Sequence, residues 1–459
     1  MTAALSPREM VRSGLCIGCG GCAAHAAARG AAMAFDGHGL LRPSGPGDWY
    51  RERSPALART CPFSPHAANE DELAARLFTG APQADAATGR YRAAYVGHVA
   101  EQDFRSRGSS GGLASWLAVE LLRRGRIDAL AHVAACDEPR RDGRLFRYRL
   151  SRSEGEIRAG AQSRYYPVEL SQVLAGILAV PGRYAVVGIP CFVKAVQLLR
   201  REHPLLRERI RYTLGLFCGH MKSARFADSL AWQMGVAPDE VRAVAFRTKA
   251  PQRPANWYRA RLAMGDGRVV EQDWWHLVDG DWGAGFFMDP ACNFCDDVMA
   301  ETADVSFGDA WVEPYASDWQ GTNVVVARSA EVAALLEEAV AQGRLALAPV
   351  DAAFVARTQA AGLRQRREGL AYRLARRRAG IVPRKRVAPD AQRPNARRRL
   401  IYRMRRSISR WSHRMFRLAR RFGAPWLYLR WARLALAAYH ALAYHRGRWG
   451  RLVERIGLR

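Results

Sequence analysis

Lysine and long apolar runs are both scarce in this sequence. Only four of its 71 basic residues are lysine, and no stretch reaches the ~18 uncharged apolar residues that a membrane-spanning helix needs. The best candidate, Trp426–Tyr444, is interrupted by Arg430 and Arg433. The first residues, Met1–Leu15, carry charges of both signs and lack the apolar core of a signal peptide. The lack of a spanning helix and of a signal peptide predicts a cytoplasmic protein, whereas the scarcity of lysine indicates an Arg- and Ala-rich proteome style.

Charge is distributed unevenly over the 459 residues. The formal net charge is +28, but Ala361–Arg459 holds 29 Lys and Arg against 3 Asp and Glu, whereas the preceding residues hold 42 against 40. Apolar residues make up 49%, which is enough for sizeable cores and too many for a globally disordered chain. The body of the chain therefore does not indicate a nucleic-acid-binding protein, because the positive charge belongs to the carboxyl-terminal part.

Three parts can be distinguished along the chain, namely residues 1–78, 91–360 and 361–459. The small polar stretch Thr79–Arg90 is typical of a linker between the first two parts. Within the second part, short apolar strands such as Tyr184–Gly188 alternate with helical patterns. This alternation predicts an α/β core with a mixed, largely parallel sheet, and a mixed α+β arrangement is the alternative.

Nine cysteines in a cytoplasmic chain favour metal or redox chemistry over disulfides. The first part contains Cys16, Cys19, Cys22 and Cys61, the last of them followed by proline. A C-x2-C-x2-C run with a later Cys-Pro pair is the ligand pattern of a bacterial ferredoxin, in which the intervening glycines let backbone N–H groups approach the sulfurs. The pattern predicts one 4Fe-4S cluster, and a structural zinc site that includes His25 is the alternative.

A second group of cysteines lies in the middle of the chain. Cys191 and Cys218 each stand where an apolar strand ends and a helix is expected, and Cys292 and Cys295 form a C-x2-C hook. The carboxyl ends of parallel strands meet at one edge of a sheet, where helix amino termini favour negative charge, so these four thiols could share a site. Buried apolar cysteines beside a separate redox or zinc pair are the alternative. Cys136 lies in no motif and is interpreted as a structural thiol.

A glycine- and serine-rich segment, Arg105–Gly112, precedes an expected helix. It ends in Ser109, Ser110, Gly111 and Gly112 and contains two arginines. Hydroxyls, a flexible backbone and guanidinium groups at a helix amino terminus suit a pyrophosphate, although the motif is not the dinucleotide-binding G-x-G-x-x-G. An ordinary turn with Ser109 or Ser110 as the helix cap is the alternative.

Taken in order, the motifs of Tyr91–Leu347 resemble the beta-subunit family of coenzyme F420-reducing hydrogenases and formate dehydrogenases. Plant 7-hydroxymethyl chlorophyll a reductase is a relative in the same family. The segments that carry the resemblance are Ser109–Gly112, Gln162–Val168, Val187–Cys191, Leu216–His220, Cys292–Cys295 and Ala303–Trp311.

The resemblance implies cofactors as well as a fold. In that family four dispersed cysteines hold a 4Fe-4S cluster beside a bound FAD, and the matching residues here are Cys191, Cys218, Cys292 and Cys295. The amino-terminal segment is similar to the ferredoxin-like part of longer members, which implies two 4Fe-4S clusters in all. The resemblance also turns Ser109–Gly112 from an open question into a candidate flavin site.

Other polar side chains in the matched region are secondary candidates for flavin or substrate contact. Lys194 follows Cys191 in the expected helix, where a cation could stabilise a reduced flavin, and a solvated helix lysine is the alternative. The remaining candidates are Ser163, Arg164, Tyr165, His220 and Lys222, followed by the weaker Asp309 and Asn323.

The arginine-rich part, residues 361–459, has a helical pattern of its own. Arg410, Arg414, Arg417 and Arg421 recur on one helical face. The other face of that helix comprises Met415, Phe416 and Leu418. This pattern is typical of an interfacial helix at an anionic membrane and predicts peripheral attachment at the inner face. Nucleic acid is a less favoured partner, and a docking arm for another subunit is a further alternative.

These features favour an iron–sulfur flavoprotein oxidoreductase. Electrons would pass from reduced ferredoxin or a similar carrier through two 4Fe-4S clusters to FAD, and then to a small-molecule substrate or a deazaflavin coenzyme. The alternatives are an electron-transfer subunit of a larger complex, and a membrane-surface protein of polysaccharide assembly with a residual redox core. No residue selects the substrate, the direction of electron flow or the oligomeric state.

Overall fold

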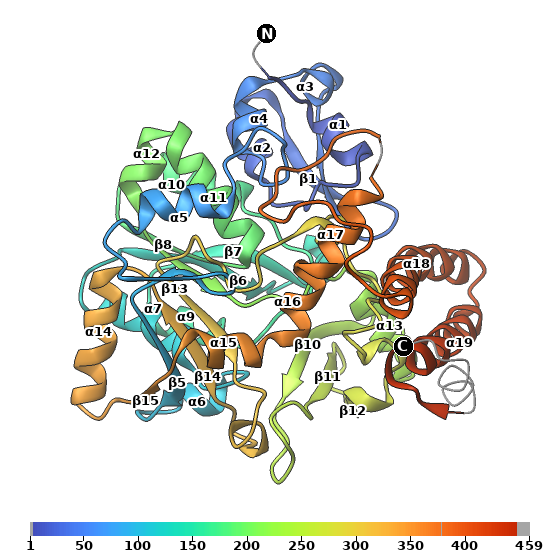
Figure 1. The fold of residues 1–459 in the computed structure, drawn as a ribbon. Coiled ribbons are helices and arrows are strands. Elements are labelled where there is room, and N and C mark those ends of the chain that lie inside the picture. Colours follow the sequence, from blue (N-terminus) through green and yellow to red (C-terminus); the bar gives the residue numbers. More distant parts are fainter. Residues whose placement is uncertain (1–2, 378, 448–459) are drawn as a thin grey trace.

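An eight-stranded sheet forms the centre of the protein (Figure 1). The computed structural model describes residues 3–377 and 379–447. In spatial order the strands are β15 (Leu345–Pro349), β5 (Ala93–Val99), β14 (Asn323–Ala327), β13 (Val305–Asp309), β9 (Ile210–Leu216), β8 (Tyr184–Gly188), β6 (Ala129–Ala135) and β7 (Phe146–Ser151). Strands β5, β6, β8, β9 and β13 share one direction, and β7, β14 and β15 run against it. The predicted α/β class with a mixed, largely parallel sheet is confirmed.

The strands of the sheet point apolar side chains to both faces, so each face is covered by its own apolar core. In β8, Tyr184 and Val186 join the core on one face, whereas Ala185 joins the core on the other. The second face is covered by α7 (Leu113–Arg123), α9 (Glu154–Ala159) and α14 (Ala330–Ala341). The first face is covered by α10 (Ser171–Ala179), α11 (Pro190–Glu202), α12 (Pro204–Arg209), α15 (Ala352–Thr358), α16 (Ala360–Arg366) and α17 (Glu368–Ala375). The short helices α6 (Phe104–Arg107) and α8 (Pro139–Asp142) lie in loops at the sheet edges.

The amino-terminal domain packs on the same face as α10 and α11. Its elements are α1 (Pro7–Arg12), α2 (Gly21–His25), β1 (Ala32–Phe35), β2 (Leu41–Ser44), α3 (Gly47–Arg51), α4 (Pro55–Thr60) and α5 (Glu70–Leu77). Helix α5 begins with a capping box, in which the Asn69 side chain accepts from Glu72 N–H and Glu72 accepts from Asn69 N–H.

The stretch Thr79–Arg90, expected to be a linker, forms most of an antiparallel hairpin whose first strand is exposed. It contains β3 (Gln83–Asp85) and most of β4 (Gly89–Tyr91), which pair antiparallel. Arg328 is buried and donates from Nη2 to the carbonyl of Thr88 at 3.2 Å. This hydrogen bond between residues 240 positions apart holds a segment whose composition alone is typical of a flexible linker.

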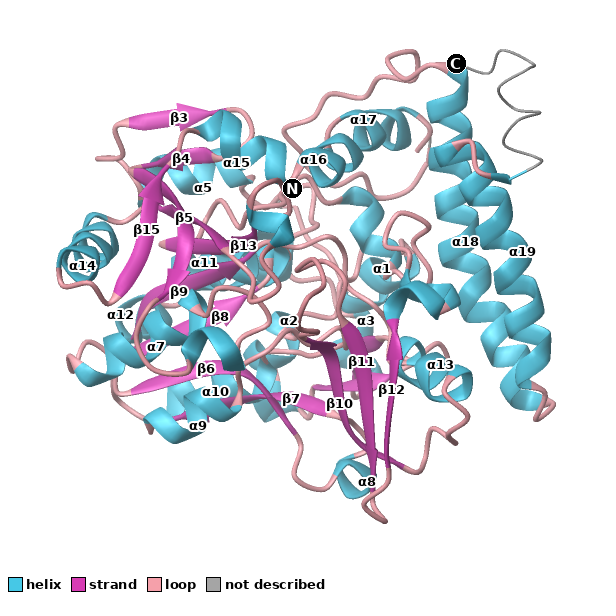
Figure 2. Cartoon of the chain, turned by 90° about the horizontal axis from the view of Figure 1, so that it is seen from below, coloured by secondary structure: helices cyan, strands magenta, loops and turns pink. Residues whose placement is uncertain are grey.

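A second, three-stranded antiparallel sheet lies beside the main one and was not predicted. It consists of β10 (Val241–Thr248), β11 (Arg259–Met264) and β12 (Val269–Asp273) and packs with α13 (Arg225–Gln233), α18 (Ala396–Arg421) and α19 (Pro425–Tyr444) in one core. Figure 2 shows α18 and α19 running side by side as a long helical hairpin at the edge of the molecule.

The helical hairpin, residues 396–444, corrects part of the prediction for the arginine-rich tail. Phe416, expected to face a membrane, is fully buried and stacks on Trp232 with ring centroids 4.3 Å apart. The inner face of α18 is therefore a protein core, whereas Arg410, Arg414 and the rest of the predicted basic face are exposed. Residues 448–459 of the predicted tail lie outside the described part of the chain. No helix in the described residues is long and apolar enough to span a membrane.

Candidate functional site

The four amino-terminal thiols lie around one small cavity. Cys16, Cys19, Cys22 and Cys61 line it together with apolar side chains of α1, α4 and β1. The C-x2-C-x2-C run is held by glycines in left-handed conformations, and a Cβ at Gly18 would lie 2.4 Å from the carbonyl oxygen of Leu41. Position 18 therefore requires glycine, because the loop approaches β2 too closely for a side chain.

Burial and mutual proximity shape the chemistry of these thiols. Burial raises the pKa of Cys19 to about 12, and it raises the pKa of Cys22 well above its usual value, with Cys16, Cys19 and Cys61 adding to the effect. Backbone N–H groups oppose the shift, as that of Gly21 does at Cys19. Such thiols ionise only beside a cation, which is what a metal cluster provides.

The central cysteines come together from three separate parts of the chain. Cys191 lies in the first turn of α11, Cys218 follows β9, and Cys292 and Cys295 flank the end of a 3-10 helix, Pro290–Phe294. Burial raises the pKa of Cys191 well above its usual value, and the other three central thiols raise it further. The Met221 N–H donates to the Cys292 Sγ at 3.3 Å.

The two thiol groups adjoin each other inside the molecule. Cys19 of the first group is close enough to Cys191 of the second to contribute to the raised pKa of Cys191. Thiols of both groups pack in the same apolar core, which also contains Leu199 and Phe294. No three His, Cys, Asp or Glu side chains within the described ranges converge as ligands of a single metal ion.

A buried ion network lies between the two thiol groups. Lys194 Nζ is 3.1 Å from Glu70, and Lys385 Nζ is 2.8 Å from Asp296. Its six side chains are all at most 7% exposed and are Glu70, Lys194, Asp296, Glu301, Lys385 and Arg386. Lys194 is therefore buried and paired and is not a solvated helix lysine, while its contact with a flavin stays a prediction.

The predicted phosphate loop at the start of α7 is packed by protein groups. A Cβ at Gly111 would lie 2.8 Å from the Asn323 side-chain oxygen, which itself accepts from the Leu113 N–H at 3.2 Å. Ser109 Oγ accepts from the Ser163 N–H at 2.8 Å, and Ser110 Oγ donates to the Thr322 carbonyl. Neither serine caps the helix, since Gly112 occupies the cap position and Asn323 supplies the hydrogen bond.

Three cations lie around this loop, and two of them, Arg247 and Lys249, were not predicted. Arg247 donates to the Ser109 carbonyl and pairs with Asp309 at 2.9 Å. Lys249 donates to the Ser110 carbonyl at 2.9 Å, and Arg105 donates to the carbonyl of Gly321. Arg105 also pairs with Asp318, so two of these three cations are balanced by carboxylates. The loop nevertheless lies at the carboxyl ends of parallel strands, the edge where α/β sheets bind ligands.

Tyr165, His220 and Lys222 share one aromatic cluster beside the central thiols. The ring of Trp282 lies 4.7 Å from that of Tyr165 and 4.5 Å from that of His220. Lys222 Nζ lies 4.6 Å from the same indole, and burial lowers the pKa of Lys222 to about 7. Arg164 is separate, because its guanidinium stacks on Phe146.

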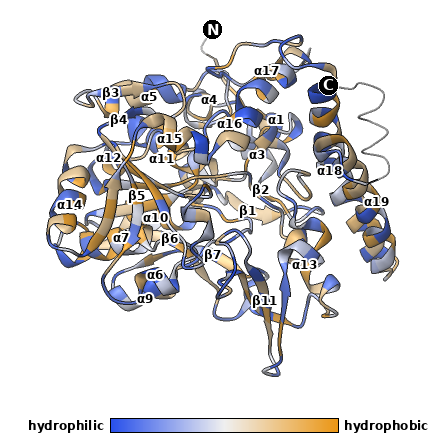
Figure 3. Ribbon diagram, turned by 60° about the horizontal axis from the view of Figure 1, so that its bottom comes forward, coloured by the Kyte–Doolittle hydropathy of each residue, from blue (hydrophilic) through white to orange (hydrophobic). Residues whose placement is uncertain are grey.

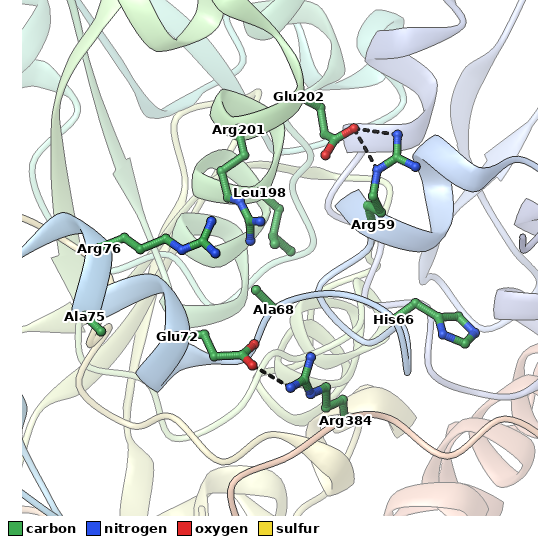
Figure 4. Close-up of a pocket in the computed structure, with 10 residues that line it drawn as sticks. All are labelled: Arg59, His66, Ala68, Glu72, Ala75, Arg76, Leu198, Arg201, Glu202 and Arg384. Atoms are coloured by element: carbon green, nitrogen blue, oxygen red, sulfur yellow. Dashed lines mark hydrogen bonds and ion pairs between the residues drawn. The ribbon is translucent and has the colours of Figure 1, made fainter. Parts of the chain in front are cut away.

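A cavity of about 470 Å³ opens next to the amino-terminal thiols. It is framed by two ion pairs, Arg59 with Glu202 at 2.6 Å and Arg384 with Glu72 (Figure 4). Arg76 and Arg201 also line it, and neither forms an ion pair with a carboxylate of the described chain. Arg59 lies two residues before Cys61, so this basic cavity is adjacent to the first thiol group.

One further residue escaped sequence reasoning altogether. Arg366, at the end of α16, is 4% exposed and donates to the carbonyls of Cys218 and Gly219 at 2.7 and 2.8 Å. Burial raises the pKa of Cys218 to about 11, and Arg366 opposes that shift. Nothing in the sequence separates Arg366 from the many other arginines around it.

Comparison with solved structures gives a fold relationship. The protein matches a chain of the F420-reducing [NiFe] hydrogenase complex from Methanosarcina barkeri with a TM-score of 0.50 and 16% identity, over 66% of this chain and 99% of that chain. No curated protein sequence matches significantly.

Comparison with protein-family models identifies the family from the amino-acid sequence itself. Residues 94–175 match the amino-terminal model of the coenzyme F420 hydrogenase/dehydrogenase beta subunit, and residues 182–353 match its carboxyl-terminal model. The two matches follow one another in order and together span more than half of the chain. The chain therefore belongs to the coenzyme F420 hydrogenase/dehydrogenase beta-subunit family.

Proposed function

We propose that this oxidoreductase-family chain is an iron–sulfur flavoprotein with a 4Fe-4S cluster on each thiol group and one FAD. It would carry electrons from a one-electron carrier to a two-electron acceptor, either a small-molecule substrate or a deazaflavin coenzyme. The observation that carries the proposal is that two sets of four thiols adjoin, with six of the eight lying in or against one apolar core. That arrangement suits an electron relay shielded from water.

The residues present fit two clusters. Each group offers four thiols, and backbone N–H groups point at sulfurs in both, from Gly21 at Cys19 and from Met221 at Cys292. Bound clusters would supply one-electron redox chemistry, which a flavin converts to two-electron chemistry. The chain itself holds the thiols in place, excludes water from them and sets charge beside them through Arg366.

The fit to FAD rests on charge at the sheet edge. Arg105, Arg247 and Lys249 lie around the loop before α7. Arg105 and Arg247 also pair with Asp318 and Asp309, and the three cations are the residues expected to bind the FAD phosphates. The loop serines already have protein partners and would contribute less than predicted. The aromatic cluster around Trp282 extends from this loop toward the central thiols.

Cofactor content tests the proposal directly. We expect full-length protein purified without oxygen to contain about eight irons per chain, with about one FAD. Iron is measured by chelator absorbance after acid release, and the flavin by chromatography of the released cofactor. Zinc in place of iron, or colourless protein, would contradict the proposal.

A second candidate is an electron-transfer subunit with no substrate of its own. It is favoured by the structural neighbour, which is described as part of a hydrogenase complex. Turnover of a candidate acceptor by the purified chain alone distinguishes the two, because a subunit would pass electrons only to its partner.

The basic cavity beside Cys61 predicts where an acidic carrier such as reduced ferredoxin binds. Changing Arg76 and Arg201 together to Glu should raise the KM for an acidic carrier about tenfold at low salt, with little change in kcat. The reason is that the change replaces attraction by repulsion at the entry to the first thiol group. Stopped-flow reduction at several ionic strengths measures the effect.

The matched control for that pair is the double variant Arg140→Glu, Arg141→Glu. Both residues are exposed on α8, outside the cavity, so this variant reverses two charges without altering the cavity. Equal KM changes in both variants would show that only net charge matters and that the cavity is not the docking site.

A further inference from the structure

The outer face of the helical hairpin is unusually basic. Residues 396–444 contain 13 arginines and neither Asp nor Glu. Within the described chain, only Arg420 pairs with a carboxylate, at 3.9 Å from Asp228. Arg410, Arg414 and Arg417 recur along the exposed side of α18, so their charge faces solvent uncompensated.

Large apolar side chains accompany these arginines. At the turn between α18 and α19, Phe422 is 65% exposed and Trp426 is 61% exposed. Leu418 and Leu434 lie exposed on the two helices leading into and out of that turn. Figure 3 shows both helices carrying hydrophilic and hydrophobic residues along their length. Solvent exposure of so many large apolar groups on one element indicates a binding surface.

The rest of the hairpin is firmly anchored. Phe416 and Tyr428, one from each helix, are fully buried and in contact, with ring centroids 5.3 Å apart. Arg397 donates to the carbonyls of Leu442 and Ala443 and thereby ties the start of α18 to the end of α19. The turn is thus presented on a rigid support and does not need its own exposed residues for folding.

We propose that the α18–α19 turn docks the protein on an anionic lipid bilayer. Phe422 and Trp426 would enter the headgroup region, while Arg410, Arg414 and Arg417 bind lipid phosphates. Arginine with aromatic and aliphatic side chains on a convex helical tip matches an interfacial membrane site, and the charge is complementary to anionic headgroups. A nucleic acid would leave exposed leucines such as Leu418 and Leu434 against phosphate, so it is the less favourable occupant.

Vesicle binding by the full-length, cofactor-loaded protein tests the proposal. The wild-type chain should sediment with vesicles of phosphatidylcholine and phosphatidylglycerol but not with phosphatidylcholine alone, and salt should weaken binding. The double variant Phe422→Ser, Trp426→Ser should bind at least about tenfold more weakly. The triple variant of Arg410, Arg414 and Arg417 to Gln should lose most of the salt dependence.

The control is Trp275→Ser, because Trp275 is 60% exposed but lies in the 3-10 helix Trp274–His276 that follows β12, outside the helical hairpin. It should bind vesicles as the wild type does, and all variants should keep the wild-type Tm. Absence of wild-type vesicle binding, or equal loss in the control and the double variant, would overturn the proposal. Binding of single-stranded RNA without vesicle binding would also overturn it. None of these outcomes depends on the cofactor content.

Discussion

Replacing Cys218 by alanine is expected to lower the iron content of anaerobically purified protein from about eight to about four per chain. Cys218 supplies one of four thiols in the central group, and its neighbours come from distant segments that cannot substitute for it. The iron left behind should belong to the amino-terminal group, whose four thiols line their own cavity. Chelator assays and electron paramagnetic resonance of the reduced protein measure the loss.

The reciprocal variant is Cys22→Ala, which should also remove about four irons and leave the central cluster and the FAD in place. Cys136→Ala is the matched control, since Cys136 is a buried free cysteine that belongs to neither group. Its iron content should equal that of the wild type. If either single variant lost all iron while remaining folded, the assignment of two independent clusters would be wrong.

The Arg386→Met variant should lose about 3–5 kcal/mol of unfolding free energy. Arg386 is 7% exposed and pairs with Glu301 at 2.5 Å and with Asp296 at 3.5 Å. Removing the guanidinium would leave the buried carboxylates of Glu301 and Asp296 with less positive charge beside them. The free-energy cost of these unbalanced buried charges exceeds the loss of the ion-pair attraction itself. Denaturant titration of the anaerobic protein, followed by circular dichroism, measures the difference between variants.

Arg384→Met provides a neighbouring control for this loss. Arg384 pairs with Glu72, but both side chains are more than 40% exposed, so the pair is screened by water. The expected loss is about 0–1 kcal/mol. Comparable losses in the two variants would show that the buried ion network does not stabilise the fold in the manner described.

Sequence patterns were most informative where local spacing and chemistry coincide. Cys16, Cys19 and Cys22 form a compact run, and the strand before Cys191 is predicted with its observed bounds, Tyr184–Gly188. The alternation of apolar residues sufficed for the α/β class because both faces of strands such as β8 are buried. Whether the thiols bind iron stays a prediction.

Contacts between residues far apart in sequence could not be predicted, because no local sequence pattern links such residues. Lys194 was expected near a flavin, yet its partner is Glu70, 124 residues earlier. The apolar face containing Phe416 was assigned to a membrane because an amphipathic helix has the same pattern whether its apolar face meets lipid or protein. The packing of Phe416 against Trp232 and Tyr428 distinguishes the two cases.

The closure of the ion network by Lys385 and Arg386 has a consequence for how the protein is made. Arg386 reaches back 315 residues to Asp71, so the amino-terminal domain completes its packing only after nearly the whole chain has been synthesised. At ribosomal speeds of about 5–20 residues per second, its cysteines wait roughly 15–60 s for that closure. During that interval the ring of Phe63, two residues after Cys61, also lacks Lys385, whose Nζ lies 5.0 Å from it in the finished fold. The cluster proposed for the first thiol group would therefore have time to assemble before this packing is complete.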